Sequence, residues 1–296
     1  MTASSQATIR EWLRRAEAEL SAAEVDTARL DSLVLLSDEL ERDKAWLLAH
    51  LDFVLQGSEM KILNTKITQR ARHVPLAYIR GKAEFYGREF TVNEHVLVPR
   101  AESEAMIDLL LNSGSGKQEM GNEKWEMKNG HGRGRGCAIV DVGTGSGCLA
   151  ITAKLELPKA DVAAIDIDPN CLKIARQNAR ALDANITFLR GNLLESADIP
   201  NSKFQILICN LPYVPEAYPI NQAARCEPKL ALFSGEDGLG HYRDLFAQVA
   251  ARSVRPTLVL TESLPKQHVA LAQLAETAGL RLTDTKGYVQ AFTHLA

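Results

Sequence analysis

A short polar motif directly follows one of the most apolar stretches of the chain. Residues 204–209 have the composition of a buried strand, and Asn210, Leu211, Pro212 and Tyr213 come next. An amide or ring-conjugated NH2 group is a poor nucleophile because its lone pair is delocalised, so acceptors must orient both of its N–H groups. The Asn210 oxygen and a backbone carbonyl at a strand end are suited to that task. The motif predicts chemistry on a planar nitrogen.

A glycine-rich turn lies upstream of this motif, where Asp141 is followed by Gly143, Thr144, Gly145 and Gly147. Glycines let the chain turn sharply from strand to helix and bring backbone N–H groups close to a ligand. Cysteine follows Gly147, so the spacing differs from the dinucleotide-binding fingerprint. The pattern instead resembles the first motif of S-adenosyl-L-methionine-dependent methyltransferases, with a bare structural turn as the alternative. Together, the two motifs predict methyl transfer to a planar nitrogen.

Three further polar residues follow predicted strands. Asp166 ends the next strand, where its carboxylate can accept hydrogen bonds from both ribose hydroxyls of the cofactor. Asp168 precedes Pro169 and a helix, which favours an N-cap over a ligand. Asn192 stands where methyltransferases carry an acidic residue that contacts the adenine amino group, and its oxygen can still accept that bond. Asn210 would also border the cofactor.

The first part of the chain has helical periodicity. Apolar residues at 9, 12, 13, 16 and 20 mark one amphipathic helix, and further helices are expected at 28–40 and 44–55. Residues 1–80 are therefore predicted to form a helical substrate-recognition domain. Residues 81–100 are predicted to be a hairpin connector built from 85–90 and 96–98. Trp12 and Trp46 are both expected in the core.

Residues 101–296 are predicted to form the catalytic domain, with a glycine-rich, polar insertion at 113–136. After it, strands and helices alternate, which is typical of α/β folds. The prediction is a doubly wound, mostly parallel, seven-stranded methyltransferase sheet preceded by the small helical domain. Its last two strands, 280–284 and 288–292, are expected to pair antiparallel at the sheet edge. The strands before them are expected at 138–142, 162–166, 186–189, 204–209 and 258–261.

Composition narrows the class of protein. The chain has 296 residues, 46% of them hydrophobic, which supports a substantial core. Its net charge of -3 argues against binding nucleic acid through a global positive field. No apolar run reaches ~18 residues, so no membrane association is expected. The five cysteines form no C-x-x-C pair and the histidines show no metal-ligand spacing, which predicts a metal-free protein in the cytoplasm.

Beyond these motifs, nearly the whole chain resembles the release factor glutamine methyltransferases. The resemblance includes 29–31 in the helical part, the connector segments 75–81 and 85–87, and the segment 98–104. It continues through the glycine turn and Asn210 to Tyr213, and then through Glu227-Pro228, 231–232, Gly235, 237–239 and 242–243. The connector and the residues after Tyr213 are more specific to this family than the glycine turn.

The resemblance implies an activity and roles for several residues. Members of this family methylate the side-chain amide of the glutamine in the Gly-Gly-Gln loop of peptide chain release factors, so release factors, free or on the ribosome, are the expected partners. The Asn210 side chain and the Leu211 carbonyl would receive the two amide N–H groups, and the Tyr213 ring would pack on the amide. Leu211 stands where the family usually has proline, although the following Pro212 still favours an extended backbone there. The C-terminal segment 287–290 also departs from the family pattern.

Several alternatives remain open from the sequence. Asn-Leu-Pro-Tyr also occurs in enzymes that dimethylate adenine in ribosomal RNA, but those carry their helical domain after the catalytic domain, so no direct nucleic-acid substrate is expected. A relative that binds release factors without transferring methyl groups is the non-enzymatic alternative. Residues 100–103 fit either an active-site loop or an ordinary helix start. Basic residues between 66 and 88 fit either a docking surface or a solvated face.

Overall fold

The computed structural model describes residues 7–113, 138–195 and 204–294. The insertion expected at 113–136 falls outside these ranges, apart from Ser113. The chain forms two compact units. The helical unit comprises Met1–Lys82 with Ile220–Cys226, and the sheet unit comprises Ala83–Pro219 with Glu227–Ala296.

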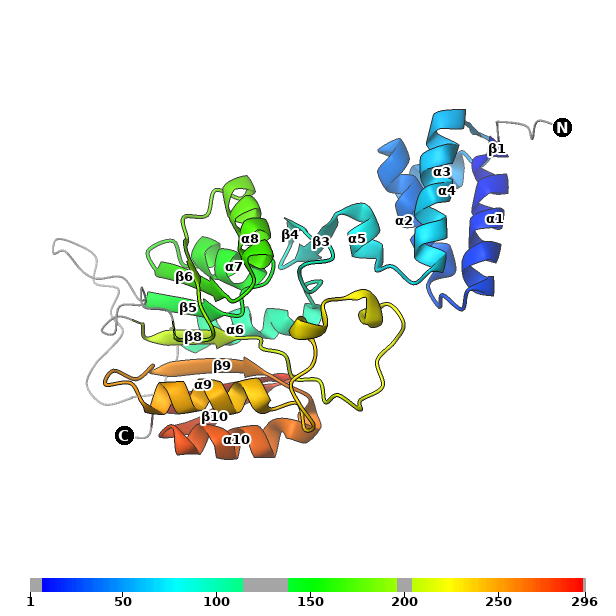
Figure 1. Ribbon diagram of the computed structural model, residues 1–296. Helices are drawn as coiled ribbons and strands as arrows, with labels where there is room; N and C mark the ends of the chain where they lie inside the picture. Colours follow the sequence, from blue (N-terminus) through cyan, green and yellow to red (C-terminus); the bar gives the residue numbers. More distant parts are fainter. Residues whose placement is uncertain (1–6, 114–137, 196–203, 295–296) are drawn as a thin grey trace. The chain divides into compact units, whose positions relative to one another are not determined.

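The helical unit packs short helices around one apolar core (Figure 1). Its first helix begins at a capping box, in which the Thr8 hydroxyl accepts the Glu11 N–H and the Glu11 carboxylate accepts the Thr8 N–H. As expected from the periodicity, Trp12 and three of the other four apolar residues of that face are buried, and Leu13 is half-buried. The elements are α1 (Ile9–Ala22), α2 (Ala28–Leu40), α3 (Lys44–Ala49), α4 (Gly57–Ala71), α5 (Leu76–Arg80), β1 (Ala7–Thr8) and β2 (Val54–Leu55).

Two local predictions in this part of the chain are wrong. The helix expected to run to residue 55 ends at Ala49, because the chain turns at His50 and then pairs β2 with β1. Trp46 is half-buried rather than in the core, and it stacks on His50 at a centroid distance of 4.2 Å. The apolar composition of residues 50–55 therefore did not distinguish a helix from a turn followed by a short strand.

The predicted hairpin exists, but with different strands. β3 (Lys82–Phe85) pairs with β4 (Arg88–Thr91), and the connecting Tyr86 and Gly87 both have positive φ (51° and 69°), as a tight hairpin turn requires. Residues 96–98 form no strand. Val96 is fully buried, so its apolar character reflects packing in the core rather than strand pairing.

Among the described residues, seven strands form one mixed sheet in the order β10-β11-β9-β8-β5-β6-β7 (Figure 1). The five strands from β9 to β7 are parallel, and β11 and β10 are antiparallel at one edge. This confirms the predicted doubly wound, mostly parallel sheet. The strands are β5 (Ala138–Val142), β6 (Asp161–Asp166), β7 (Thr187–Arg190), β8 (Ile206–Cys209), β9 (Leu258–Glu262), β10 (Leu280–Lys286) and β11 (Val289–His294).

Helices cover both faces of the sheet because successive strand residues alternate between two cores. Ile206 and Ile208 face the core that includes α6, α7 and α8, whereas Leu207 and Cys209 face the core formed with α9 and α10. The helices are α6 (Glu104–Ser113), α7 (Cys148–Glu156), α8 (Pro169–Ala181), α9 (Gly240–Ala250) and α10 (His268–Thr277). The carboxyl ends of β5, β6, β8 and β9 consequently meet at one edge, where the predicted site residues lie.

No helix in the described ranges has both the length and the apolar content to cross a bilayer.

Candidate active site

The glycine turn between β5 and α7 takes the shape its glycines allow. Gly143, Gly145 and Gly147 have φ of 75°, 55° and 82°, in the left-handed region that side chains disfavour. A Cβ at Gly147 would lie 3.0 Å from Ala175, so this glycine lets α7 approach α8. At Gly145 a Cβ would meet nothing within 4 Å, so the backbone there borders open space. The turn thus exposes backbone at its middle and packs closely at its end.

Asp141 precedes this turn, and only one of its two carboxylate oxygens is hydrogen-bonded. Its Oδ2 accepts the Thr144 hydroxyl at 2.6 Å and the Ala150 N–H at 3.2 Å. Its Oδ1 is buried and has no hydrogen-bond partner among the described residues. Burial raises the pKa of Asp141 to about 7, and the two hydrogen bonds oppose the rise. A cationic or N–H group of a ligand would supply the missing partner.

The carboxylate of Asp166 ties the end of β6 to the glycine turn. One oxygen accepts the Gly145 N–H and the other the Asp168 N–H, both at 2.9 Å. Burial raises the pKa of Asp166, which the backbone hydrogen bonds oppose. Asp168 caps α8 as expected: its side chain accepts the Asn170 N–H at 2.8 Å, and Pro169 is the first helical residue.

Asn192 lies beside Asp166 at the end of the neighbouring strand. The N–H of the preceding Gly191 donates to the Asp166 carbonyl at 3.1 Å. The Asn192 side chain is exposed and donates to Glu195 at 3.3 Å. Its side-chain oxygen has no partner among the described residues, so it is available as an acceptor.

Asn210 leaves the end of β8 with its amide oriented by a second side chain. Its Nδ2 donates to the Ser103 hydroxyl at 2.9 Å. Ser103 itself is buried and lies in the 3-10 turn Ala101–Ser103 before α6, where no side-chain cap is formed. Residues 100–103 therefore lead directly into a helix, and Ser103 also contacts the acceptor motif. Because the NH2 group is engaged, the Asn210 oxygen faces the other way, and it accepts no hydrogen bond within the described ranges.

The next residue connects the acceptor motif to the glycine turn. Leu211 is buried, and its Cδ2 lies 3.0 Å from where a Cβ of Gly143 would stand. Its carbonyl accepts no hydrogen bond from another described residue. Pro212 and Tyr213 are half-buried. The two oxygens assigned to the substrate amide are thus free in the described part of the chain, at the strand end next to the turn.

Glu262, which the sequence analysis missed, anchors the ring of Tyr213. It is the last residue of β9 and is 1% exposed, and its Oε1 accepts the Tyr213 hydroxyl at 3.0 Å. Burial raises the pKa of Glu262, while the hydroxyl groups of Ser103 and Tyr213 oppose the rise. Burial, together with this carboxylate, also raises the pKa of Tyr213, so its phenol stays protonated. A usable signal existed: Glu262 directly follows a predicted strand, as Asp166 ends one.

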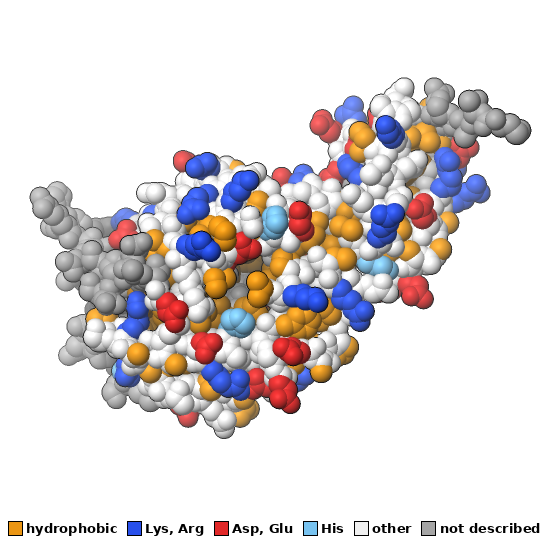
Figure 2. All heavy atoms as spheres, viewed as in Figure 1, with side chains coloured by type: hydrophobic (Ala, Val, Ile, Leu, Met, Phe, Trp, Pro, Cys, Tyr) orange, Lys and Arg blue, Asp and Glu red, His pale blue; other side chains and the backbone are white. Residues whose placement is uncertain are grey.

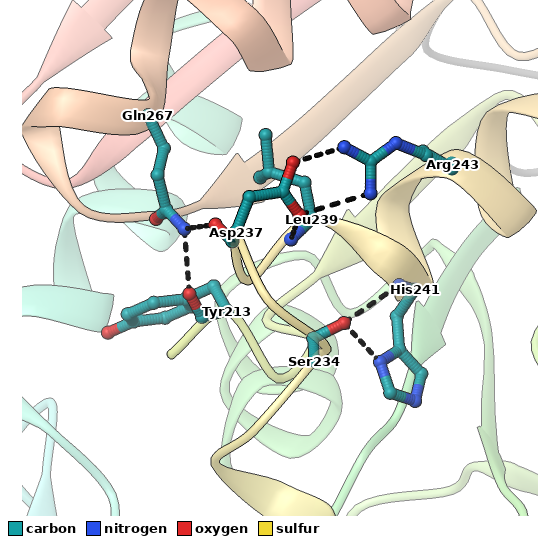
Figure 3. Close-up of polar contacts among 7 residues, drawn as sticks. All are labelled: Tyr213, Ser234, Asp237, Leu239, His241, Arg243 and Gln267. Carbon is teal, nitrogen blue, oxygen red and sulfur yellow. Dashed lines mark hydrogen bonds and ion pairs between the residues drawn. The ribbon is translucent and has the colours of Figure 1, made fainter. Parts of the chain in front are cut away.

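Tyr213 is also held by a hydrogen bond to its main-chain carbonyl (Figure 3). The Gln267 side-chain NH2 donates to the Tyr213 carbonyl at 2.8 Å and to the Asp237 carbonyl at 2.7 Å. Its oxygen accepts the Leu264 N–H at 2.9 Å. Gly238 has φ of 78°, and a Cβ there would collide with the Tyr213 carbonyl. These contacts explain why a glycine follows Asp237 in the segment that resembles the family.

The residues around Gln267 stabilise the same loop (Figure 3). Arg243 pairs with the Asp237 carboxylate, which also accepts the Leu239 N–H at 3.0 Å. The Ser234 hydroxyl contacts the His241 ring and accepts the His241 N–H at 2.8 Å. The family segment after residue 230 is therefore held together by its own contacts, and Gln267 links it to Tyr213 of the acceptor motif.

Arg100 and Glu227, two residues of the resemblance far apart in sequence, form one ion pair. Glu227 is buried, and its second oxygen accepts the Val98 N–H at 3.0 Å. This contact fixes the segment that leads to Ser103. It joins the segment 98–104 to Glu227-Pro228 within the sheet unit.

The basic run between residues 66 and 88 is largely neutralised within each unit. Four of its cations have acidic partners remote in sequence, and Figure 2 shows acidic and basic side chains interspersed on the viewed face of each unit. The structure thus supports the solvated-face interpretation over a docking surface. The pairs are Lys66–Glu39, Arg70–Asp31, Arg80–Asp38 and Arg88–Glu156.

Comparison with known proteins identifies the family. Residues 11–81 match the PrmC N-terminal domain, and residues 139–226 match a methyltransferase domain. The release factor glutamine methyltransferase of Deinococcus radiodurans is 33% identical over 96% of this chain and 98% of its own length. The chain belongs to the release factor glutamine methyltransferase family. The family member of Enterococcus faecalis is 34% identical over 80% of this chain and 79% of its own length.

Longer relatives and one solved structure are also similar to this chain. The bifunctional methyltransferase of Rickettsia conorii is 31% identical, and this chain spans 53% of its length. The chain thus covers about half of such relatives. The catalytic domain of hMettl16, solved with a MAT2A 3′UTR hairpin, has a TM-score of 0.52 at 11% identity, covering 79% of this chain and 78% of that one. That likeness shows the methyltransferase fold alone.

Proposed function

We propose that this chain transfers a methyl group from S-adenosylmethionine to the side-chain amide nitrogen of the glutamine in the Gly-Gly-Gln motif of peptide chain release factors. The observation that carries this proposal is the contact between Asn210 and Ser103. It commits the Asn210 NH2 group and leaves the oxygen to accept one N–H of a substrate amide. The free Leu211 carbonyl is the acceptor for the other N–H.

The role of these acceptors is to orient a weak nucleophile. A carboxamide nitrogen whose two N–H groups are both bound presents its face to one direction. Holding two reactants in line in this way is worth up to ~7–11 kcal/mol of the barrier. The Tyr213 ring, fixed through Glu262 and Gln267, is the surface on which the amide packs. The product proton can leave to water, so the proposal assigns no general base.

The residues beside the acceptors fit the cofactor. When bound, S-adenosylmethionine supplies an electrophilic methyl group on a sulfonium. The unpartnered Oδ1 of Asp141 offers an acceptor for the methionine part, and the absence of a side chain at Gly145 leaves space beside it. The Gly143, Thr144 and Gly147 backbone completes the turn. Asp166 has remaining acceptor capacity for the ribose hydroxyls, and the Asn192 oxygen can accept the adenine amino group.

The test is a labelling experiment with radiolabelled S-adenosylmethionine and a purified release factor. A matched release factor whose loop glutamine is replaced by asparagine serves as the control substrate. The proposal expects label on the first protein and none on the second. Equal labelling of both would contradict it. Label that disappears with ribonuclease would instead favour an RNA acceptor, and tight cofactor binding without turnover would favour a binding protein.

A further inference from the structure

Glu262 is a buried carboxylate to which the proposed reaction assigns no step. It is 1% exposed at the end of β9, next to the strand from which the acceptor motif departs. Its Oε1 accepts the Tyr213 hydroxyl, whereas its Oε2 is buried and has no hydrogen-bond partner among the described residues. A buried carboxylate oxygen without a partner costs stability, so its retention needs a reason.

The Ser103 hydroxyl, in turn, has a proton for which no acceptor has been named. Its oxygen already accepts the Asn210 NH2 group, so the hydroxyl proton must find its own acceptor. Ser103 is 2% exposed, which rules out bulk water as that acceptor. Its hydroxyl lies close enough to the Glu262 carboxylate to act on the pKa of that group. Ser103 thus has a hydroxyl proton without an assigned acceptor, and Glu262 has a buried oxygen without a donor.

We propose that Glu262 is a positioning residue, whose carboxylate fixes Tyr213 through the phenol and Asn210 through the Ser103 hydroxyl. This inference rests on the proposed function, because it concerns how that acceptor site is held. The order of donors is Asn210 to Ser103, Ser103 to Glu262, and Tyr213 to Glu262. One buried anion therefore sets both the direction of the Asn210 oxygen and the plane of the Tyr213 ring.

The chain of donors also explains why the Asn210 amide has a defined orientation. A serine hydroxyl alone can accept or donate, so it would tolerate either orientation of the amide. A serine whose proton is committed to a carboxylate can only accept from Asn210. The NH2 group must then face Ser103, and the oxygen must face away from it. Orientation is thus imposed by charge rather than by shape.

The experiment measures steady-state methylation of a release factor by the full chain and by Glu262→Gln and Glu262→Ala variants. Misplacement of a reacting group by about 1 Å can cost 10²-fold, so E262A is expected to lose roughly that factor in kcat. E262Q retains an acceptor for Tyr213 and should lose roughly tenfold. The KM for the release factor and the calorimetric Kd for S-adenosylmethionine should stay within about twofold. A kcat of E262A equal to wild type, or a change confined to cofactor Kd, would overturn the proposal.

A double-mutant cycle separates positioning from a general loss of structure. Once Ser103→Ala and Tyr213→Phe have removed both links, E262A should cost little further activity, because groups that act as a unit are non-additive. Fully additive losses would contradict the proposal. Glu156→Gln is the matched control, since Glu156 pairs with Arg88 away from the acceptor motif, and its kinetics should be unchanged. Circular dichroism checks that each variant is folded.

Failure of the proposed function gives a different result. A wild-type chain that leaves the release factor unlabelled overturns the function itself. Crystal structures of wild type and E262A then decide the inference on Glu262 alone. A rotated Asn210 amide or a displaced Tyr213 ring in the variant supports it, and unmoved side chains overturn it.

Discussion

Replacing Tyr242 by phenylalanine should destabilise the sheet unit by removing one oxygen atom. Tyr242 lies on α9, is fully buried, and reaches the ends of β8 and β9. Its hydroxyl accepts the Glu262 N–H at 3.1 Å and donates to the Cys209 carbonyl at 2.9 Å or the Glu262 carbonyl at 2.6 Å. The last paired residues of the two strands are Cys209 and Thr261, so the phenol continues the pairing where the ladder stops.

The magnitude follows from the groups left without partners. Tyr242→Phe keeps the ring but orphans one buried N–H and one buried carbonyl, each at about 1–2 kcal/mol. The expected loss is therefore roughly 2–4 kcal/mol in the free energy of unfolding. At about 2–4 °C per kcal/mol for a unit of this size, the melting midpoint should fall by roughly 4–16 °C.

Urea unfolding followed by circular dichroism is the assay, with the m-value compared between variants. Tyr86→Phe is the control, because the Tyr86 hydroxyl bonds Asp108 at 3.1 Å where water can replace it, and about 1 kcal/mol or less should be lost. A Y242F chain within about 0.5 kcal/mol of wild type would refute the reasoning, since that is the scatter of neutral surface substitutions.

Three further outcomes are expected. Gln267→Glu places a carboxylate against the carbonyls of Tyr213 and Asp237, so kcat should fall about tenfold or more at pH 8. At lower pH the protonated acid can donate a hydrogen bond, so kcat should recover partly. A ratio of variant to wild-type kcat that does not change with pH would count against this role of Gln267. Burial raises the pKa of Asp141 from 3.8 to about 7, so as pH rises this carboxyl loses its proton in the unfolded chain before it does so in the folded chain. The free energy of unfolding should therefore fall as pH rises between these two values, by at most about 4 kcal/mol. Asp141→Asn should flatten that fall in urea titrations at pH 5 and pH 8, and an unchanged slope would be the contrary result. Leu211→Pro should preserve or raise turnover while the Leu211 packing is lost, and a collapse of activity would argue against the proposed acceptor geometry.

Local sequence patterns predicted the sheet and much of the candidate site, because neighbouring residues govern the backbone geometry on which both depend. The apolar run before Asn210, the glycines after Asp141 and the proline after Asp168 each determine backbone geometry within a few positions. Parallel strands then bring their carboxyl ends to one edge, which places Asp166 near the glycine turn.

The contacts that sequence patterns missed are long-range. Ser103 and Asn210 are separated by 107 positions, and Tyr213 and Glu262 by 49. No local periodicity specifies such pairs, because they depend on which strands become neighbours and how far each side chain reaches. The basic run was ambiguous for the same reason, since acids such as Asp31 lie outside its sequence window.

Short apolar segments misled in a different way. Val96 is apolar because it is buried, and the segment around it pairs with no strand. Residues 50–55 continue the helical composition of α3, yet the chain turns there to pair two short strands. Burial and hydrogen-bonding pattern are separate properties, and composition reports mainly the first.

The most direct test of the central claim is the rate of methyl transfer by Asn210→Ala, measured in a single turnover with saturating S-adenosylmethionine. Asn185→Ala, an exposed asparagine before β7, is the control. Loss of one preorganised polar group at a reacting centre is worth about 10²–10³-fold. The account predicts a loss of that size for Asn210→Ala, with the Kd for S-adenosylmethionine nearly unchanged and the control at the wild-type rate. A variant without the Asn210 oxygen that transfers methyl at the wild-type rate would contradict the account.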